Sequence, residues 1–166
     1  MNSFKDKVAI VTGGGAGIGL ATARLFAAKG ANVLITGRRL SALKKVAASN
    51  LNIKGFVADA SDPEAVARTV AAALEYWGRL DILVNNAGGG VIQPLADANA
   101  KTISEIFGVN VIGPTLLAAA AIPHLEEAKG AIVNMSSTYG SKAAAGLSLY
   151  GCEQGGYRAS DALLGP

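Results

Sequence analysis

A glycine-rich turn after a short apolar run is the stretch of this sequence best suited to bind a ligand. The run, residues 8–12, is β-branched and apolar, and five of the next seven residues are glycines. Glycines let a backbone turn tightly and approach a ligand, because no Cβ stands in the way. The first N–H groups of a following helix favour an anion. The pattern predicts a pyrophosphate cradle, with a plain tight turn as the alternative, made by Gly13, Gly15, Gly17, Ile18 and Gly19.

Two arginines follow the next predicted strand. Gly37, Arg38 and Arg39 stand where an acidic residue would bind the 2′-hydroxyl of an NAD ribose. Guanidinium groups suit a 2′-phosphate instead, because they can donate two parallel hydrogen bonds to it. The sequence therefore predicts NADP as the cofactor, with NAD possible. The alternative is that both arginines lie on the surface and begin a helix.

Two more polar groups end strands of the same predicted sheet. Asp59 and Ala60 follow the third strand, and Asn85-Asn86-Ala87-Gly88 follows the fourth. Ligands bind at the carboxyl edge of such sheets, where these strand ends meet. Asp59 could accept a hydrogen bond from an adenine amino group, or could simply lie near a helix start. The second group, taken alone, could be an ordinary Asn/Gly turn.

The elements that position these residues alternate between strand and helix. Strands are expected at 8–12, 32–36, 53–58, 81–84 and 131–135, and helices at 20–29, 40–49, 63–77 and 101–125. Asp62 and Pro63 mark one helix start, and Gly113-Pro114 predicts a kink or break in the last helix. Alternation of this kind requires a parallel sheet with helices on both faces. The expected fold class is α/β, a Rossmann-type doubly wound sheet.

The composition narrows the possible functions. The 166 residues carry a net charge of +3 with scattered basic doublets, which argues against nucleic-acid binding. A single cysteine excludes a disulfide framework and a zinc site made of cysteines, and no metal is expected. The polar start and short apolar runs predict neither a signal peptide nor a membrane span, so a cytoplasmic protein is expected.

Several motifs together resemble the short-chain dehydrogenase/reductase family. They are Thr12-Gly13-x-x-x-Gly17-Ile18-Gly19, Asn85-Asn86-Ala87-Gly88 and the strand-end serine motif Val133–Ser137. The resemblance implies that the asparagines of the second motif tie strands together. It also implies that the backbone of Asn86, Ala87 and Gly88 passes close to the ribose of the cofactor. The family reduces ketones or oxidises alcohols of small molecules, and its members usually form homotetramers.

The same resemblance assigns three catalytic residues. Tyr150 lies thirteen residues after Ser137, and Asn110 lies twenty-seven residues before Ser137, as in the family. There the serine holds the carbonyl oxygen, the tyrosine transfers the proton, and the asparagine holds a water in the proton relay. A free tyrosine has a pKa of about 10, which a nearby lysine ammonium lowers. Taken singly, the three could be a loop hydroxyl, a surface aromatic residue and a polar helix residue.

The resemblance covers residues 6–151 and then stops. The lysine that the family has four residues after the tyrosine is here Gln154, and the later strands and substrate lid of the family are not recognisable. We expect residues 1–150 to form the dinucleotide-binding domain and 151–166 an aberrant, poorly packed tail. Two functions are compatible with this pattern: an NADP-linked dehydrogenase or reductase impaired by Gln154, or a non-catalytic nucleotide-binding remnant. The substrate is not predicted.

The tail also suggests how the departure arose. Gly151–Gly165 can be encoded so that loss of one guanine from the first codon changes the reading to Gly-Ala-Ser-Lys-Ala-Ala-Ile-Glu-His-Leu. That reading restores a lysine at position 154 and an apolar pattern at helical spacing. We therefore interpret the tail as a shifted reading frame, the alternative being a divergent or designed terminus. The interpretation requires that codons 152–154 of the gene read TGC GAG CAA.

Overall fold

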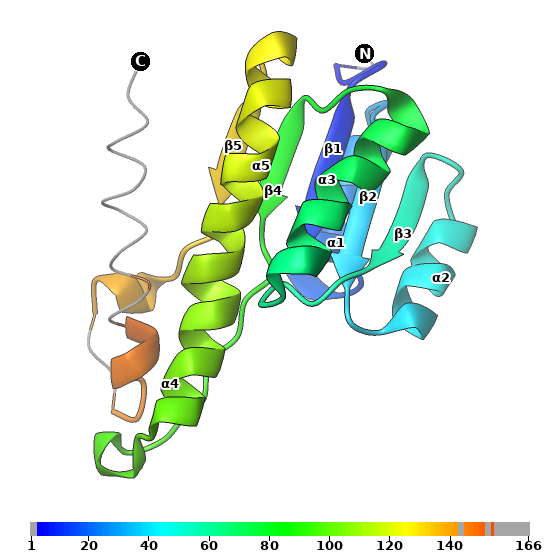
Figure 1. The fold of residues 1–166 in the computed structure, drawn as a ribbon. Coiled ribbons are helices and arrows are strands. Elements are labelled where there is room, and N and C mark those ends of the chain that lie inside the picture. Colours follow the sequence, from blue (N-terminus) through cyan, green and yellow to red (C-terminus); the bar gives the residue numbers. More distant parts are fainter. Residues whose placement is uncertain (1–2, 143–144, 152–153, 155–166) are drawn as a thin grey trace.

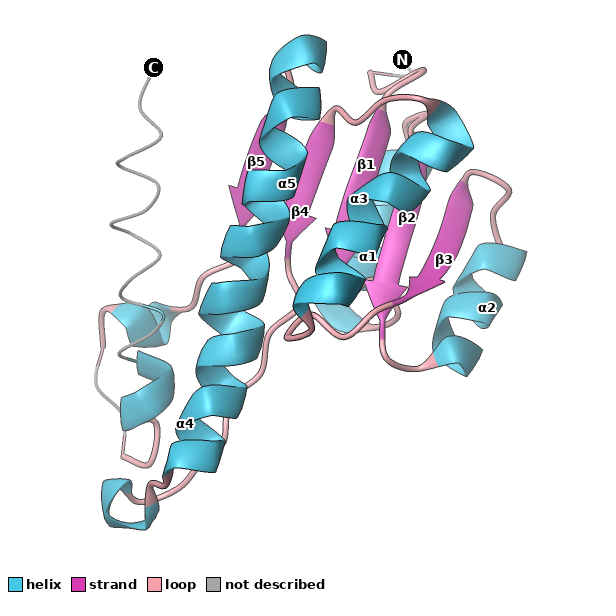
Figure 2. Ribbon diagram, in the orientation of Figure 1, coloured by secondary structure: helices cyan, strands magenta, loops and turns pink. Residues whose placement is uncertain are grey.

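Five parallel strands form one sheet in this chain, which a computed structural model describes over residues 3–142, 145–151 and 154 (Figure 1). The order across the sheet is β3-β2-β1-β4-β5, and all the arrowheads lie at one end (Figure 2). The strands are β1 Val8–Thr12, β2 Asn32–Gly37, β3 Ile53–Val57, β4 Ile82–Asn85 and β5 Ala131–Asn134. The predicted strands are therefore present, with ends that shift by one residue.

Helices cover both faces of the sheet, which confirms the predicted Rossmann-type α/β fold. In Figure 1, α3 and α5 cross the face turned toward the viewer. The helices are α1 Gly17–Ala28, α2 Leu40–Ala48, α3 Pro63–Trp77, α4 Ala100–Phe107 and α5 Gly113–Ala128, with a π-helical turn, η2 Gly108–Ile112, between the last two. Two short 3-10 turns, η1 Leu95–Asp97 and η3 Thr138–Gly140, are also present, and residues 148–151 and 154 are helical.

The alternating side chains of β1 contribute to two hydrophobic cores, one on each face of the sheet. Val8 and Ile10 pack with α3 and α5, while Ala9 and Val11 pack with α1 and α2. All five β1 residues are buried, because a central parallel strand has helices above and below it. The continuous apolar run in the sequence therefore encodes the middle of the sheet.

The ends of α3 follow the predicted signals. The Asp62 side chain accepts a hydrogen bond from the Glu64 N–H (3.0 Å), with Pro63 in the first turn. Gly78 ends the helix in the left-handed conformation (φ +70°), which glycine adopts without steric cost.

The last long helix differs from its prediction. No break occurs at Gly113-Pro114: Pro114 lies in the first turn of α5, and the helical path continues through η2. The irregularity is the π-helical turn just before that pair. A Cβ at Gly113 would overlap the carbonyl oxygen of Ala60, so the glycine allows the helix to approach the residues after β3.

The helix from Ala100 to Ala128 is long and apolar enough to cross a membrane by length and composition alone. The apolar stretch is therefore longer than the sequence analysis expected, and the core helix of a soluble protein passes the same test. Leu117, Ala121 and Leu125 of α5 are buried in the core shared with α3 and β4. Part of the apolar surface of this helix is therefore used for packing within the domain.

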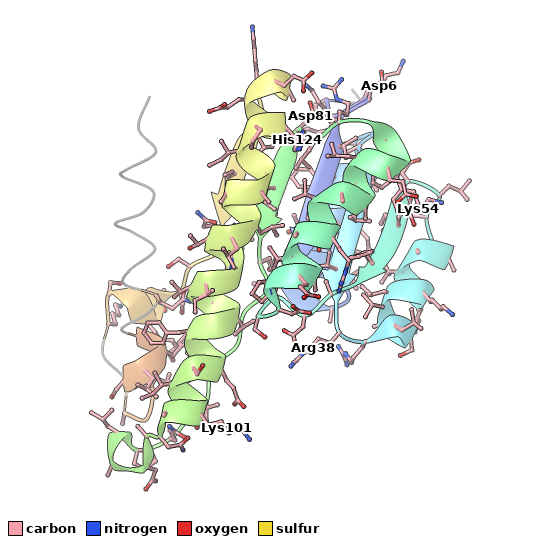
Figure 3. The ribbon with its side chains drawn as sticks, in the orientation of Figure 1. Asp6, Arg38, Lys54, Asp81, Lys101 and His124 are labelled. Atoms are coloured by element: carbon pink, nitrogen blue, oxygen red, sulfur yellow. The ribbon has the colours of Figure 1, made fainter. Side chains whose placement is uncertain are left out.

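A buried carboxylate joins β1 and β4 at the amino end of the sheet. Asp81 is 2% exposed and accepts hydrogen bonds from Lys7 Nζ (2.8 Å), Val8 N (2.9 Å) and Arg79 Nε and Nη2 (2.8 and 2.6 Å). Burial alone would raise the pKa of Asp81, but these donors outweigh burial and lower the pKa to about 2. Figure 3 shows Asp81 at the end of the sheet opposite Arg38.

We predict that Asp81→Asn lowers the free energy of unfolding at pH 7 by about 2 kcal/mol. A carboxyl whose folded pKa is depressed stabilises the fold above its unfolded pKa, about 4, and loses that contribution as the pH falls toward 2. The difference between wild type and variant should therefore shrink between pH 4 and pH 2 in urea titrations. Glu64→Gln is the control, because among the described residues the Glu64 carboxylate forms an ion pair with exposed Arg68 alone (3.7 Å). A difference independent of pH would contradict this assignment.

Candidate functional site

A cavity of about 740 Å³ opens at the carboxyl edge of the sheet. It lies between the turn after β1 and the residues that follow β2, β3 and β4. Most of the residues predicted to bind a cofactor line it: Gly13, Gly15, Arg38, Arg39, Asp59, Ala60, Asn86, Ala87 and Gly88. Residues from four separate strand ends therefore meet around one space, whose size suits a small organic ligand.

The glycine turn has the backbone geometry that a close ligand requires. Gly13 (φ +68°) and Gly17 (φ +54°) are both left-handed, a conformation that side chains disfavour. Gly17 and Ile18 begin α1, and Ile18 is 64% exposed. Gly19 packs beneath the turn, where a Cβ would overlap the Asn86 amide and the Gly13 carbonyl oxygen. These three residues do not line the cavity, but they shape the helix start that faces it.

Asn85, the last residue of β4, and Asn86, which follows it, join this strand to both of its neighbours. Asn85 Nδ2 donates to Asn134 Oδ1 of β5 (2.9 Å), and Asn86 Nδ2 donates to the Thr12 carbonyl of β1 (2.8 Å). The Thr12 hydroxyl in turn accepts from the N–H groups of Asn86 (3.0 Å) and Ala87 (2.8 Å). Thr12 is thus a supporting residue to which the sequence analysis gave no role. Its signal was a hydroxyl at the end of an otherwise apolar strand.

The charged side of the cavity combines two arginines with one carboxylate. Arg38 and Arg39 are exposed after β2, and neither forms an ion pair with any other described residue. Figure 3 shows Arg38 at the end of the sheet where the arrowheads lie. Hydrogen bonds from the Ser61 N–H and hydroxyl hold the pKa of Asp59 below its ordinary value, and the Arg38 charge acts in the same direction against partial burial. An anionic group and a hydrogen-bond donor could therefore both bind here.

Asn110 holds the loop that follows β4. Its side chain, 1% exposed, donates from Nδ2 to the Gly89 carbonyl (2.6 Å) and accepts at Oδ1 from the Gly89 N–H (2.9 Å). The amide therefore satisfies both backbone groups of one residue. Asn110 is presented by η2, and Gly88 and Gly89 line the cavity.

Tyr150 contacts the same loop at the next residue, Gly90. A Cβ at Gly90 would lie 3.0 Å from Cδ2 of the Tyr150 ring, so glycine allows the ring to pack there. The Tyr139 ring meets Tyr150 edge to face at 6.3 Å. Ser137 connects through Tyr139, whose N–H donates to Ser137 Oγ (3.3 Å). Asn110 and Tyr150 thus converge on neighbouring glycines, while Ser137 and Tyr150 lie outside the cavity wall.

The residue at the expected lysine position can also be placed. Gln154 is helical and 4% exposed, four residues after Tyr150. Residues 152–153, including Cys152, and 155–166 lie outside the described residues, and so does most of the predicted tail. Gly90 and Ser61 are among the residues that line the cavity without having been predicted as site residues. In the sequence, the only signal for Gly90 was its place as the last of three consecutive glycines. The only signal for Ser61 was its place two residues after Asp59.

Comparison with known proteins agrees with this geometry. The model of the short chain dehydrogenase family matches residues 7–159. An uncharacterized oxidoreductase of Mycobacterium tuberculosis is 40% identical over 157 residues, and a meso-2,3-butanediol dehydrogenase of Serratia marcescens is 37% identical over 139. The crystal structure of a short-chain dehydrogenase from Streptomyces avermitilis superposes with a TM-score of 0.90 at 32% identity. The chain belongs to the short-chain dehydrogenase family.

The matches cover most of this chain and a smaller share of each relative. They span 91% of the chain and 60% of the Mycobacterium protein, 82% and 55% for the Serratia enzyme, and 98% and 61% for the Streptomyces structure. The chain therefore spans about 60% of the length of the relatives it matches. The family consists of oxidoreductases that use NAD or NADP and act on small molecules.

We predict that Gly19→Ala destabilises the chain by about 1–3 kcal/mol, because the new methyl group overlaps Asn86 and Gly13. Gly15→Ala is the matched control: its Cβ would meet Ala42 and Leu43 at 3.5 and 3.7 Å, ordinary contact distances. Alanine normally stabilises a helix interior relative to glycine, so a loss at residue 19 in α1 would report the close packing. Denaturant titrations that show equal stability for the two variants would contradict the model of the turn.

Proposed function

We propose that this chain binds NADP(H) at the carboxyl edge of its sheet and carries the site of an alcohol- or ketone-converting oxidoreductase. One observation carries the proposal. The left-handed glycine turn, the arginines after β2 and the loop held by Asn110 and packed on Tyr150 all adjoin one cavity. Cytoplasmic location stays a prediction based on the polar start and short apolar runs. The family's tetramer is expected for a full-length relative, and we expect this chain to lose it.

The residues around the cavity fit the parts of a dinucleotide. The glycine turn (Gly13, Gly15, Gly17, Ile18, Gly19) would hold the pyrophosphate, aided by the free N–H groups at the start of α1. Arg38 and Arg39 would bind the 2′-phosphate, and Asp59 with Ala60 would contact the adenine. Asn86, Ala87 and Gly88 would contact the ribose next to the nicotinamide. When bound, the nicotinamide donates or accepts a hydride.

The proton would be moved by residues of this chain. Tyr150 would exchange a proton with the substrate oxygen, the Ser137 hydroxyl would hydrogen-bond that oxygen, and Asn110 would hold a water near the tyrosine. Packing against Gly90 and Tyr139 restricts the orientation of the Tyr150 ring. Gln154 provides no positive charge to favour the phenolate form, so we expect this chain to show little turnover.

We predict that Arg38→Asp reverses the cofactor preference. The ratio of NADP to NAD affinity should fall roughly 10- to 100-fold at low salt. The substitution removes a charge-assisted hydrogen bond to the 2′-phosphate and places a negative carboxylate beside that negative group. Isothermal titration with both dinucleotides measures the ratio. Lys44→Asp makes the same charge change at an exposed residue outside the cavity wall and should leave the ratio nearly unchanged. An unchanged ratio in Arg38→Asp would remove the 2′-phosphate assignment.

We predict that Gln154→Lys raises the rate of NADPH-dependent ketone reduction by roughly 100-fold or more, because an ammonium one helical turn from Tyr150 favours proton transfer. Gln154→Met, of similar length and without charge, should not. Acetoin is one suitable test ketone, since a relative is named for 2,3-butanediol. Robust NADPH oxidation by the unmodified chain would show that the lysine is not needed.

The second candidate is a nucleotide-binding protein without catalytic activity. Gln154 at the lysine position favours it. Cofactor binding without turnover in both wild type and Gln154→Lys would support this alternative. The division into a domain of residues 1–150 and an aberrant tail of residues 151–166 stays a prediction. The shifted reading frame also stays a prediction, and sequencing the gene decides it.

A further inference from the structure

The turn after β3 fixes one oxygen of a cavity-lining carboxylate and leaves the other available. Asp59 Oδ1 accepts hydrogen bonds from the Ser61 N–H (2.9 Å) and the Ser61 hydroxyl (2.8 Å). No hydrogen bond to Asp59 Oδ2 is present among the described residues. Asp59 and Ser61 both line the cavity. The carboxylate is therefore held in one orientation before a ligand binds.

The same turn is supported from behind by the helix that carries Asn110. A Cβ at Gly108 would lie 3.2 Å from the Ser61 Cβ, and a Cβ at Gly113 would overlap the Ala60 carbonyl oxygen. The two glycines flank Asn110 in and beside η2. Because η2 packs this closely, residues 60–61 cannot withdraw toward it. The Ser61 hydroxyl is thus kept beside Asp59.

An ionised carboxylate only accepts hydrogen bonds, which makes it selective between purines. Adenine presents an amino donor at carbon 6, whereas hypoxanthine presents a carbonyl acceptor there. The first would pair with Asp59 Oδ2 and the second would be repelled. Arg38, which acts on Asp59 by its charge, helps to keep the carboxylate ionised.

We propose that Ser61 is a positioning residue for base recognition. Its hydroxyl orients the Asp59 carboxylate so that the site prefers a 6-amino purine over a 6-oxo purine. The inference rests on the proposed binding of NADP(H), and it assigns a task to a residue that would not itself contact the base. Ser61→Ala would then weaken the choice between bases more than it weakens dinucleotide binding as such.

The test measures the affinities of NADP⁺ and its hypoxanthine analogue by isothermal titration for four proteins: wild type, Ser61→Ala, Ser61→Thr and Asp59→Asn. Wild type should prefer the adenine form. Asp59→Asn should abolish the preference. Ser61→Ala should reduce it roughly three- to tenfold, because one of the two hydrogen bonds that orient the carboxylate is lost while the bond from the residue 61 N–H remains. Ser61→Thr keeps a hydroxyl and should keep most of the preference. Thermal unfolding of each variant checks that the fold is retained.

The contrary outcomes are distinguishable. If Ser61→Ala prefers the adenine dinucleotide as strongly as wild type does, while Asp59→Asn loses this preference, Ser61 has no positioning role. The proposed function would then stay intact. Equal affinity of wild type for both dinucleotides would overturn base recognition by Asp59 and Ser61 while leaving dinucleotide binding standing. Failure of wild type to bind either dinucleotide would overturn the proposed function together with this inference.

Discussion

The hydrogen bonds between the end of β1 and the residues after β4 fix the geometry on which the candidate site depends. The Thr12 hydroxyl accepts two N–H groups, and the Asn86 amide returns a bond to the Thr12 carbonyl. This pairing brings Asn86 so close to the glycine turn that Gly13 and Gly19 have little or no room for a Cβ. The glycine turn and the loop after β4 are therefore joined into one unit by three hydrogen bonds.

Charge is distributed unevenly between the two ends of the sheet. At the amino end, the Asp81 carboxylate accepts hydrogen bonds from Lys7, Arg79 and a backbone donor, so each of these charged side chains has a partner of opposite charge. At the carboxyl end, Arg38 and Arg39 have no described ion-pair partner, and one oxygen of Asp59 has no described donor. The paired groups stabilise the fold, while the unpaired groups are available to a ligand. This division is common in open parallel sheets, whose ligands bind beyond the carboxyl ends of the strands.

Local signals made most of the fold predictable. Apolar runs, the Asp62-Pro63 helix start and the glycine turn each act over a few residues, so the sequence alone indicated strands, helix ends and fold class. The strand ends differ from the prediction because backbone pairing with the neighbouring strand sets where a strand ends. Gly37 pairs with Val57, and Asn85 pairs with Asn134. The π turn was not predictable, because it depends on contacts of Gly108 and Gly113 with residues far back in the chain. The contact of Tyr150 with Gly90 is non-local in the same way.

The π turn has a consequence for how insertions and deletions would act on this protein. Such a turn accommodates one residue more than an α-helical turn while the helix on each side keeps its own face toward its neighbours. Removal of one residue within 108–112 would therefore regularise the helix and leave α4 and α5 packed as before. The amide of Asn110 would no longer reach both backbone groups of Gly89. A one-residue deletion here would thus leave a protein that folds but whose loop after β4 is no longer held by Asn110.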